Sequence, residues 1–298
     1  MKTKEEIIYY EKPELRQPDL ILGFEGWPNA AEVSSFSLQY MVDHLKAKRF
    51  ASIPKEPFYQ MTSLRPVAVI KEGRLLELKS SENHFYYTEN PSGKDFIFFY
   101  GIEPHFHWDV FTRLVLDLAQ KFGVSQIITL GGTYDYTPHS FPTLVSALFN
   151  HEDLKEEVTR AELHLTDYTG PISIHTFILE TARERGLKAI SLWGHAPHYL
   201  QARNVKVAFN VLKRLVHLTG MEIDLSNLER ASDYFDQQVN DLVKQDPKLQ
   251  EVISKLEEAY KRSEKISLSS GKEEESKEDK VVYIQAFLKK QEEDKSDA

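Results

Sequence analysis

The sequence predicts an α/β fold in which helices cover both faces of a largely parallel sheet and a charged helical extension follows. A strand-length apolar run and a glycine-bearing loop recur in that order four times, and amphipathic helices follow. Strands that alternate with helices are typical of parallel sheets, and strands apolar at every position are typical of burial on both faces. The hydrophobic share of 41% is enough to build a core.

The four expected central strands are the clearest elements of this pattern. They comprise residues 20–24, 96–100, 126–130 and 189–193. Asn29 is suited to cap the helix after the first strand, and Glu32 three residues later completes a capping-box pair. Gly123 and Gly220 stand where helices commonly end in a left-handed glycine.

A different pattern separates the first two of these strands. Two short apolar runs between residues 67 and 78 flank Glu72-Gly73, which predicts a β-hairpin. We expect this hairpin to add antiparallel strands to one edge of the sheet. A further helix is expected at residues 172–186.

The chain divides into three expected parts. Residues 1–222 form the α/β core, residues 223–264 form a helical arm with a narrow apolar stripe, and residues 265–298 form a largely disordered charged tail. The stripe must pack on the core, on the arm itself or on another chain. Its candidate oligomer or partner contacts are Phe235, Val239 and Leu242.

Composition narrows the classes of function. The chain has 37 basic and 46 acidic residues, and its net charge of −9 disfavours nucleic acid and anionic membrane surfaces as partners. The absence of cysteine excludes disulfides, zinc–thiolate sites and cysteine nucleophiles. No apolar run reaches the ~20 residues of a membrane span, and no signal peptide is evident, so a cytoplasmic location is expected.

Polar residues follow the expected central strands. Because the carboxyl ends of parallel strands meet at one edge, where α/β sheets bind ligands, these residues are candidates for a site. The candidates are Glu25, Trp27, Asn29, Gly131, Gly132, Asp135, His139 and His198.

Each candidate also has a structural interpretation. Gly131-Gly132 is typical of a tight turn as well as of a phosphate cradle. Asp135 and His139 are either an acid–base pair or loop residues that fix a turn. The loops lack a Walker A motif, a dinucleotide fingerprint and a Gly-x-Ser-x-Gly elbow, so no cofactor is expected and no catalytic residue is assigned. The histidine pairs have no companion carboxylate or thiol at ligand spacing, so no metal is expected.

Six segments of the sequence, taken together, resemble the proteasome assembly chaperone 2 family. They are Gly23–Ala31, Leu130–His139, Tyr168–Ile172, Ser191–Tyr199, Leu212–Leu215 and Gly220–Asp224, and their order and spacing match over residues 19–262. The resemblance implies a three-layer α/β/α sandwich related to nucleoside phosphorylases, a helical C-terminal part, and a homo-trimer or homo-tetramer. For the eukaryotic members of the family, the implied role is assembly of the proteasome α-ring without catalysis.

This chain departs from some archaeal members of that family, which contact proteasomes through a hydrophobic–Tyr–any residue tail. It ends Lys295-Ser296-Asp297-Ala298, so docking by such a tail is not expected. Its longer arm is similar to that of bacterial members.

Two functions remain open from the sequence. The first is an oligomeric assembly chaperone or scaffold without catalytic activity. The second is a small-molecule-binding protein or an enzyme of hydrolase, phosphorylase or carboxylate–amine ligase type, which would use the loops at the carboxyl edge. Some family members carry the ligase label, but no ATP-binding motif is visible here.

Overall fold

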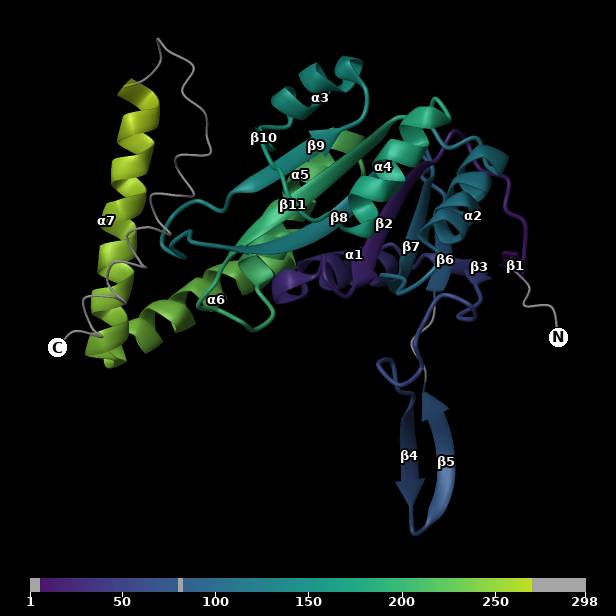
Figure 1. Ribbon diagram of the computed structural model, residues 1–298, viewed down its shortest axis with the longest axis horizontal. Coiled ribbons are helices and arrows are strands. Elements are labelled where there is room, and N and C mark those ends of the chain that lie inside the picture. The colour runs from purple at the N-terminus through teal and green to yellow at the C-terminus, as the bar shows by residue number, and fades with distance from the viewer. Residues whose placement is uncertain (1–5, 80–82, 270–298) are drawn as a thin grey trace.

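The computed structural model describes residues 6–79 and 83–269 and places nine strands of this part of the chain in one sheet (Figure 1). The strand order is β1-β3-β6-β7-β2-β8-β11-β9-β10. In that order the strands are Ile8–Tyr9, Lys48–Ile53, Asn83–Thr88, Phe96–Ile102, Asp19–Glu25, Gln126–Asp135, Ala189–Pro197, Val145–Phe149 and His164–Leu165.

The four predicted strands form the centre of this sheet. β7, β2, β8 and β11 are neighbours and run parallel, with Leu22 of β2 opposite both Phe99 and Thr129. The flanking pairs β1–β3, β3–β6, β6–β7 and β11–β9 are antiparallel. The carboxyl ends of the central strands therefore lie along one edge, as predicted.

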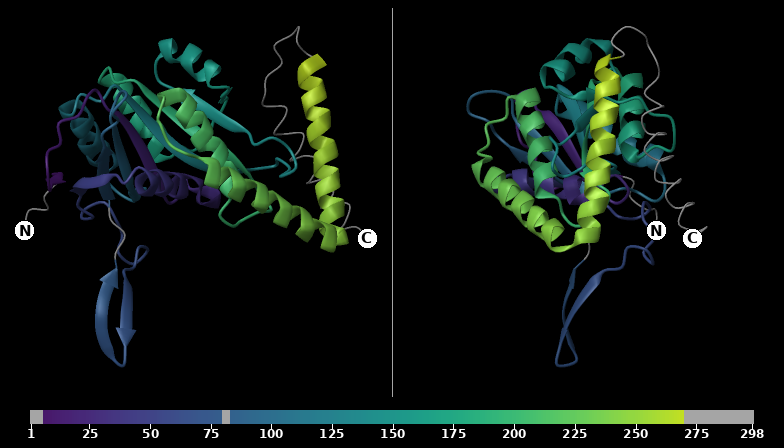
Figure 2. Two further views of the ribbon diagram at one scale, coloured as in Figure 1. Left: turned by 180° about the vertical axis from the view of Figure 1, so that it is seen from behind. Right: turned by 90° about the vertical axis from the view of Figure 1, so that its left-hand side faces the viewer.

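Helices cover both faces of the sheet, which confirms the three-layer α/β/α architecture (Figures 1 and 2). α1 (Val33–His44) and α5 (Val205–Thr219) pack on one face, and α2 (Trp108–Lys121) and α4 (Ile174–Glu184) pack on the other. Each face has its own apolar cluster. The shorter helices are η1 (Ala30–Glu32), η2 (Glu152–Leu154) and α3 (Lys155–Arg160).

The predicted hairpin forms, but the expectation that it joins the sheet is wrong. β4 (Val67–Lys71) and β5 (Arg74–Lys79) make a separate two-stranded sheet that projects away from the core (Figure 1). Every residue of both strands is exposed. The antiparallel positions beside β7 belong instead to β6 and β3, whose buried faces carry Phe85 and Phe50. These aromatic side chains pack in the core, which the hairpin residues do not.

The arm consists of two long helices. α6 (Ser226–Gln245) lies along α5, and α7 (Pro247–Ser269) turns back beside the connection between β8 and β9 (Figure 2). The rings of Phe141 and Tyr260 lie 5.0 Å apart at that contact, and Ile253 and Leu256 of α7 are buried. α7 continues past the expected arm limit at 264, and residues 270–298 of the expected tail lie outside the described residues.

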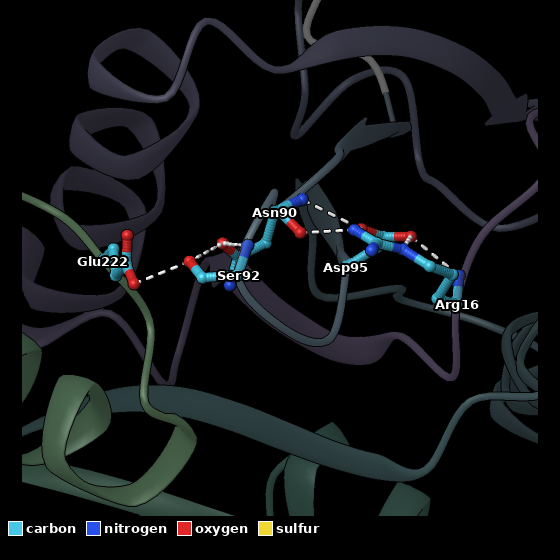
Figure 3. A network of polar contacts seen from close by, with 5 residues as sticks. All are labelled: Arg16, Asn90, Ser92, Asp95 and Glu222. Atoms are coloured by element: carbon cyan, nitrogen blue, oxygen red, sulfur yellow. Dashed lines mark hydrogen bonds and ion pairs between the residues drawn. The ribbon is translucent and has the colours of Figure 1, made fainter.

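A polar network joins three segments at the opposite edge of the sheet (Figure 3). The buried carboxylate of Asp95 accepts hydrogen bonds from the backbone and guanidinium of Arg16, at 2.7 and 2.9 Å, and from the backbone of Asn90 at 2.8 Å. Burial alone would raise the pKa of Asp95, but these hydrogen bonds outweigh it and the pKa is lowered. Ser92 donates to Glu222 at 2.6 Å, which ties the β6–β7 turn to the segment before the arm.

Within the part of the chain that the structure describes, no helix has the length and apolar character needed to cross a bilayer.

Candidate functional site

The loop after β2 borders a cavity of about 730 Å³ beside α1. Glu25 and Asn29 line this cavity together with Tyr100. The Tyr100 hydroxyl donates to the Glu25 carboxylate, and burial together with this hydrogen bond raises the pKa of Tyr100. Two candidates from the sequence therefore contribute to one concave surface.

Asn29 does not cap α1 in the predicted way. The residue before the helix is Glu32, which adopts a left-handed φ of 55°, and the turn of η1 delays the helix until Val33. Asn29 reaches the first turn from outside: its Oδ1 accepts from the Ser35 backbone at 3.0 Å and its Nδ2 donates to the Ser35 hydroxyl at 2.9 Å. It also forms a bridge with Gly132. The expected capping box is therefore wrong, because Ala31 and Glu32 both adopt left-handed backbone angles between Asn29 and the start of α1.

Gly131 and Gly132 lie inside β8 rather than in a turn. A Cβ on Gly132 would stand 2.4 Å from the Ala30 carbonyl oxygen, and one on Gly131 would stand 2.8 Å from the Trp193 ring. Such distances are shorter than real Cβ contacts. Gly132 thus lets the chain before α1 approach β8 closely, and Gly131 lets the Trp193 indole of β11 lie against β8.

Trp27 presents an exposed indole at the tip of the first loop. Its backbone N–H donates to Glu103 at 3.3 Å, and Glu103 also accepts from the Ile174 backbone at 2.9 Å. Burial raises the pKa of Glu103. This carboxylate, which sequence reasoning missed, joins the loops after β2 and β7 to the beginning of α4.

Asp135 and His139 do not form the acid–base pair that the sequence allowed. His139 is buried, where its Nδ1 is 2.7 Å from the Tyr199 hydroxyl and its Nε2 is 3.3 Å from Asn240 of α6. Burial lowers the pKa of His139. Its contacts make it a hydrogen-bonding residue at the junction of the core and the arm. The ring of His198 lies 4.5 Å from the ring of Tyr136, tilted by 50°, beside Asp135.

The partner of Asp135 is His195. The Asp135 carboxylate lies 2.7 Å from His195 Nδ1, and the other ring nitrogen of His195 lies 2.8 Å from the hydroxyl of Ser146. His195 lies within the segment Ser191–Tyr199, which contributes to the family resemblance, but no role for it could be inferred from the sequence alone. Sequence reasoning did not identify Ser146. Ser146 reaches the site because β9 pairs antiparallel with β11, a long-range pairing that no local pattern reveals.

The described residues contain no group of three or more His, Asp or Glu side chains arranged to hold a metal ion.

Comparison with known proteins identifies the family of this chain. The family model of the PAC2 family matches residues 23–243. The chain belongs to the PAC2 family. No match was found among curated proteins.

Solved structures similar to this PAC2-family chain come from several bacteria. A protein of unknown function from Corynebacterium glutamicum ATCC 13032 has a TM-score of 0.80 and 24% identity, over 87% of this chain and 98% of that one. A PAC2 family protein from Streptomyces avermitilis has a TM-score of 0.69 and 27% identity, over 76% and 95%. A proteasome-assembly chaperone homologue from Mycobacterium tuberculosis has a TM-score of 0.71 and 24% identity, over 78% and 98%.

Proposed function

We propose that this PAC2-family chain is an oligomeric assembly chaperone or scaffold that acts through protein contacts. The observation that carries the proposal is the apolar face of the β4–β5 hairpin. Family membership and the neighbour described as a proteasome-assembly chaperone homologue support the same role. The net charge of −9 accords with protein partners rather than nucleic acid or anionic membranes.

The apolar character of the hairpin follows from its register. Cross-strand partners share a face, so Ala68 lies with Leu78, and Ile70 lies with Leu75. A bulge opposite Ile70 adds Leu76 to the same side. This apolar hairpin face therefore consists of Ala68, Ile70, Leu75, Leu76 and Leu78.

The opposite face is mixed. It carries Val67, Val69, Glu77 and Lys79, and the last two form an ion pair at 3.3 Å. An ion pair between residues two apart on a strand requires both side chains on one side. The hairpin is thus amphipathic.

Burial of the apolar hairpin face would stabilise an assembly. Its four large side chains are 54% to 64% exposed. Full burial of an aliphatic side chain contributes about 1.5–3 kcal/mol, so covering the exposed parts of four contributes about 5 kcal/mol. A two-stranded hairpin is itself marginally stable in water without such cover. A second copy of the chain is the partner we favour, because the same face projects from every copy and homo-oligomers dominate among soluble assemblies.

The arm offers a second contact surface in this proposal. Val239 is buried within the chain, Phe235 lies at the junction with the core beside His139, and Leu242 is 62% exposed. Of the three stripe residues, Leu242 is thus placed for contact with another chain. We propose that residues 1–222 act as the core, that residues 223–264 assist assembly as the arm, and that the assembly is the homo-trimer or homo-tetramer implied by the resemblance.

The hairpin test uses two matched double variants. Ile70→Ser with Leu76→Ser alters the apolar hairpin face, and Val67→Ser with Val69→Ser alters the mixed face to a similar extent. Light scattering after size exclusion measures the mass of each. We expect the wild type and the mixed-face variant to be oligomers and the apolar-face variant to be monomeric. A monomeric wild type, or two variants that assemble alike, would contradict the proposal.

A second candidate function is small-molecule binding at the cavity beside α1. The cavity volume of about 730 Å³ favours it. Arg203 in the lining pairs with Glu32 at 2.6 Å, which leaves the carboxylates of Glu25 and Asp43 to suit a cationic ligand. Spermidine is a suitable probe in isothermal titration calorimetry. Binding that is lost in Glu25→Gln would support this candidate, and the absence of heat at millimolar spermidine would remove it.

A further inference from the structure

Three side chains at the carboxyl edge of the sheet form a chain of hydrogen bonds that the proposed assembly role does not use. Ser146 Oγ lies 2.8 Å from His195 Nε2, and His195 Nδ1 lies 2.7 Å from Asp135 Oδ2. The three residues come from β9, β11 and β8. A serine, a histidine and an aspartate in this order are the arrangement that activates a serine hydroxyl in acyl transfer.

The direction of each hydrogen bond follows from the chemistry of the groups. An ionised carboxylate only accepts, so the proton on His195 must reside on Nδ1, where it points at Asp135. Nε2 then carries a lone pair and accepts from the Ser146 hydroxyl. Burial is the largest single influence on the pKa of Asp135 and would raise it. The hydrogen bond and charge interaction with His195, the backbone N–H of Tyr136 and the charge of His198 together outweigh burial, so the pKa is lowered. Asp135 therefore stays ionised and fixes His195 in the tautomer that a general base requires.

The sheet holds this group rigidly. Trp193 and His195 point to the same face of β11, because side chains alternate along a strand. Ser146 is the antiparallel partner of Trp193, and Asp135 is the parallel partner of Pro197. The His195 backbone also donates to the Leu144 carbonyl at 3.0 Å. Sites built on neighbouring strands hold their geometry better than sites on loops.

A buried donor without a partner in the described part of the chain belongs to the residue that pairs with Ser146 in the sheet. The indole Nε1 of Trp193 is buried and finds no hydrogen-bond partner among the described residues. Buried N–H groups are nearly always satisfied, so an orphan calls for an explanation. Trp193 is the backbone partner of Ser146 across β11 and β9. A substrate oxygen that gains negative charge beside the serine is a partner that would satisfy this N–H.

Access to the serine sets the size of the substrate. Ser146 is 7% exposed, whereas the side chains of His195 and Asp135 are 17% and 39% exposed. On the other side, Ser146 pairs with His164 of β10, and residues 164–172 are exposed throughout. Tyr168 and Ile172 in this segment present apolar surface. A small, uncharged acyl group suits such an approach better than a large or charged one.

We propose that Ser146 is a nucleophile that hydrolyses small carboxylic esters, with His195 as its general base and Asp135 as a positioning residue. Ser146 Oγ forms a bond to the carbonyl carbon as its proton passes to His195 Nε2. The bond from that carbon to the leaving oxygen breaks, and the alcohol departs with the proton from His195. Water then attacks the acyl-serine with His195 as base, which releases the carboxylic acid and restores Ser146. One ester and one water thus give one acid and one alcohol.

This activity is separate from the proposed assembly function. Neither the hairpin variants nor the oligomeric state enters the chemistry at Ser146. A failure of one proposal therefore leaves the other standing.

The test is covalent labelling of the full-length protein with a fluorophosphonate. In that reaction the Ser146 oxygen bonds to phosphorus, the phosphorus–fluorine bond breaks, and fluoride leaves while His195 takes the proton. Peptide mapping by mass spectrometry should place the label on Ser146 of the wild type. His195→Gln should slow labelling by about 100-fold, in line with the loss of a general base. Asp135→Asn should slow it and change its pH profile, because the histidine tautomer is no longer fixed.

Ser191→Ala is the matched control. Ser191 is also a buried serine of the sheet, but it hydrogen-bonds Thr129 at 2.6 Å. This variant should label like the wild type, and Ser146→Ala should lose both the label and the hydrolysis of p-nitrophenyl acetate. A wild type without label on Ser146 would overturn the proposal, whether or not any variant folds. So would ester hydrolysis that persists at the wild-type rate in Ser146→Ala.

Discussion

Buried His175 should make the free energy of unfolding depend on pH, and replacing this one residue should reveal its share of that dependence. It lies in the first turn of α4, where its ring is fully buried 5.4 Å from the Phe24 ring and 5.1 Å from the Trp193 ring. Neither ring nitrogen has a hydrogen-bond partner among the described residues. Burial disfavours the charged form and lowers the pKa of His175 from 6.5 to about 3.

The sign follows from the two states. The pKa of His175 in the folded state lies below its value in the unfolded chain, so the unfolded chain binds the proton first as the pH falls. Stability is therefore fully present above about pH 7.5 and decreases down to about pH 3. With these two pKa values, the loss at pH 5 amounts to about 2 kcal/mol.

The assay compares urea unfolding of the wild type and of His175→Phe at pH 7.5 and pH 5.0. Other groups titrate in both proteins, so the difference between them isolates His175. We expect the wild type to lose about 2 kcal/mol more than the variant between these pH values. His217→Gln, which changes an exposed histidine of α5, should behave like the wild type. An equal loss in wild type and His175→Phe would refute the assignment of a neutral, buried histidine.

Two further predictions concern the stability of the α/β core, one at each edge of the sheet. Asp95→Asn removes the acceptor of several charge-assisted hydrogen bonds and should lower the free energy of unfolding at pH 7 by about 2–3 kcal/mol. The pKa of Asp95 is lower in the folded protein than in the unfolded chain. Its contribution to stability is therefore present above the unfolded pKa and is lost as the pH falls through the folded pKa. The melting temperatures of the wild type and the variant should converge in acid. Gly132→Ala should destabilise by about 1–3 kcal/mol, because its Cβ has no space. Gly93→Ala, whose Cβ meets only the Asn90 amide at 3.5 Å, should melt like the wild type.

The core of the fold was predictable because its signals are local. Each central strand is apolar at every position, and that pattern identifies burial on both faces without knowledge of its neighbours. Gly123 and Gly220 adopt the positive φ values expected of helix-ending glycines. The carboxyl edge then follows from the direction of the strands.

The arrangement of the site was not predictable, because it depends on pairings far apart in the sequence. Asp135 has His139 four residues away, and a local reading pairs the two, yet strand alternation and register bring His195 to it instead. Ser146 enters only through the antiparallel strand β9. The β4–β5 hairpin was also only partly predictable. Its apolar residues predict two strands, but the local sequence does not show whether those strands pair with the main sheet.

Native mass spectrometry of the untreated full-length protein tests the central claim, contact between copies through the apolar hairpin face, most directly. It reports the number of subunits and any protein retained on them. We predict a complex of three or four copies that dissociates to single chains when Ile70 and Leu76 are replaced by serine. A wild-type protein that is a single chain, with or without another protein bound to it, would contradict the account.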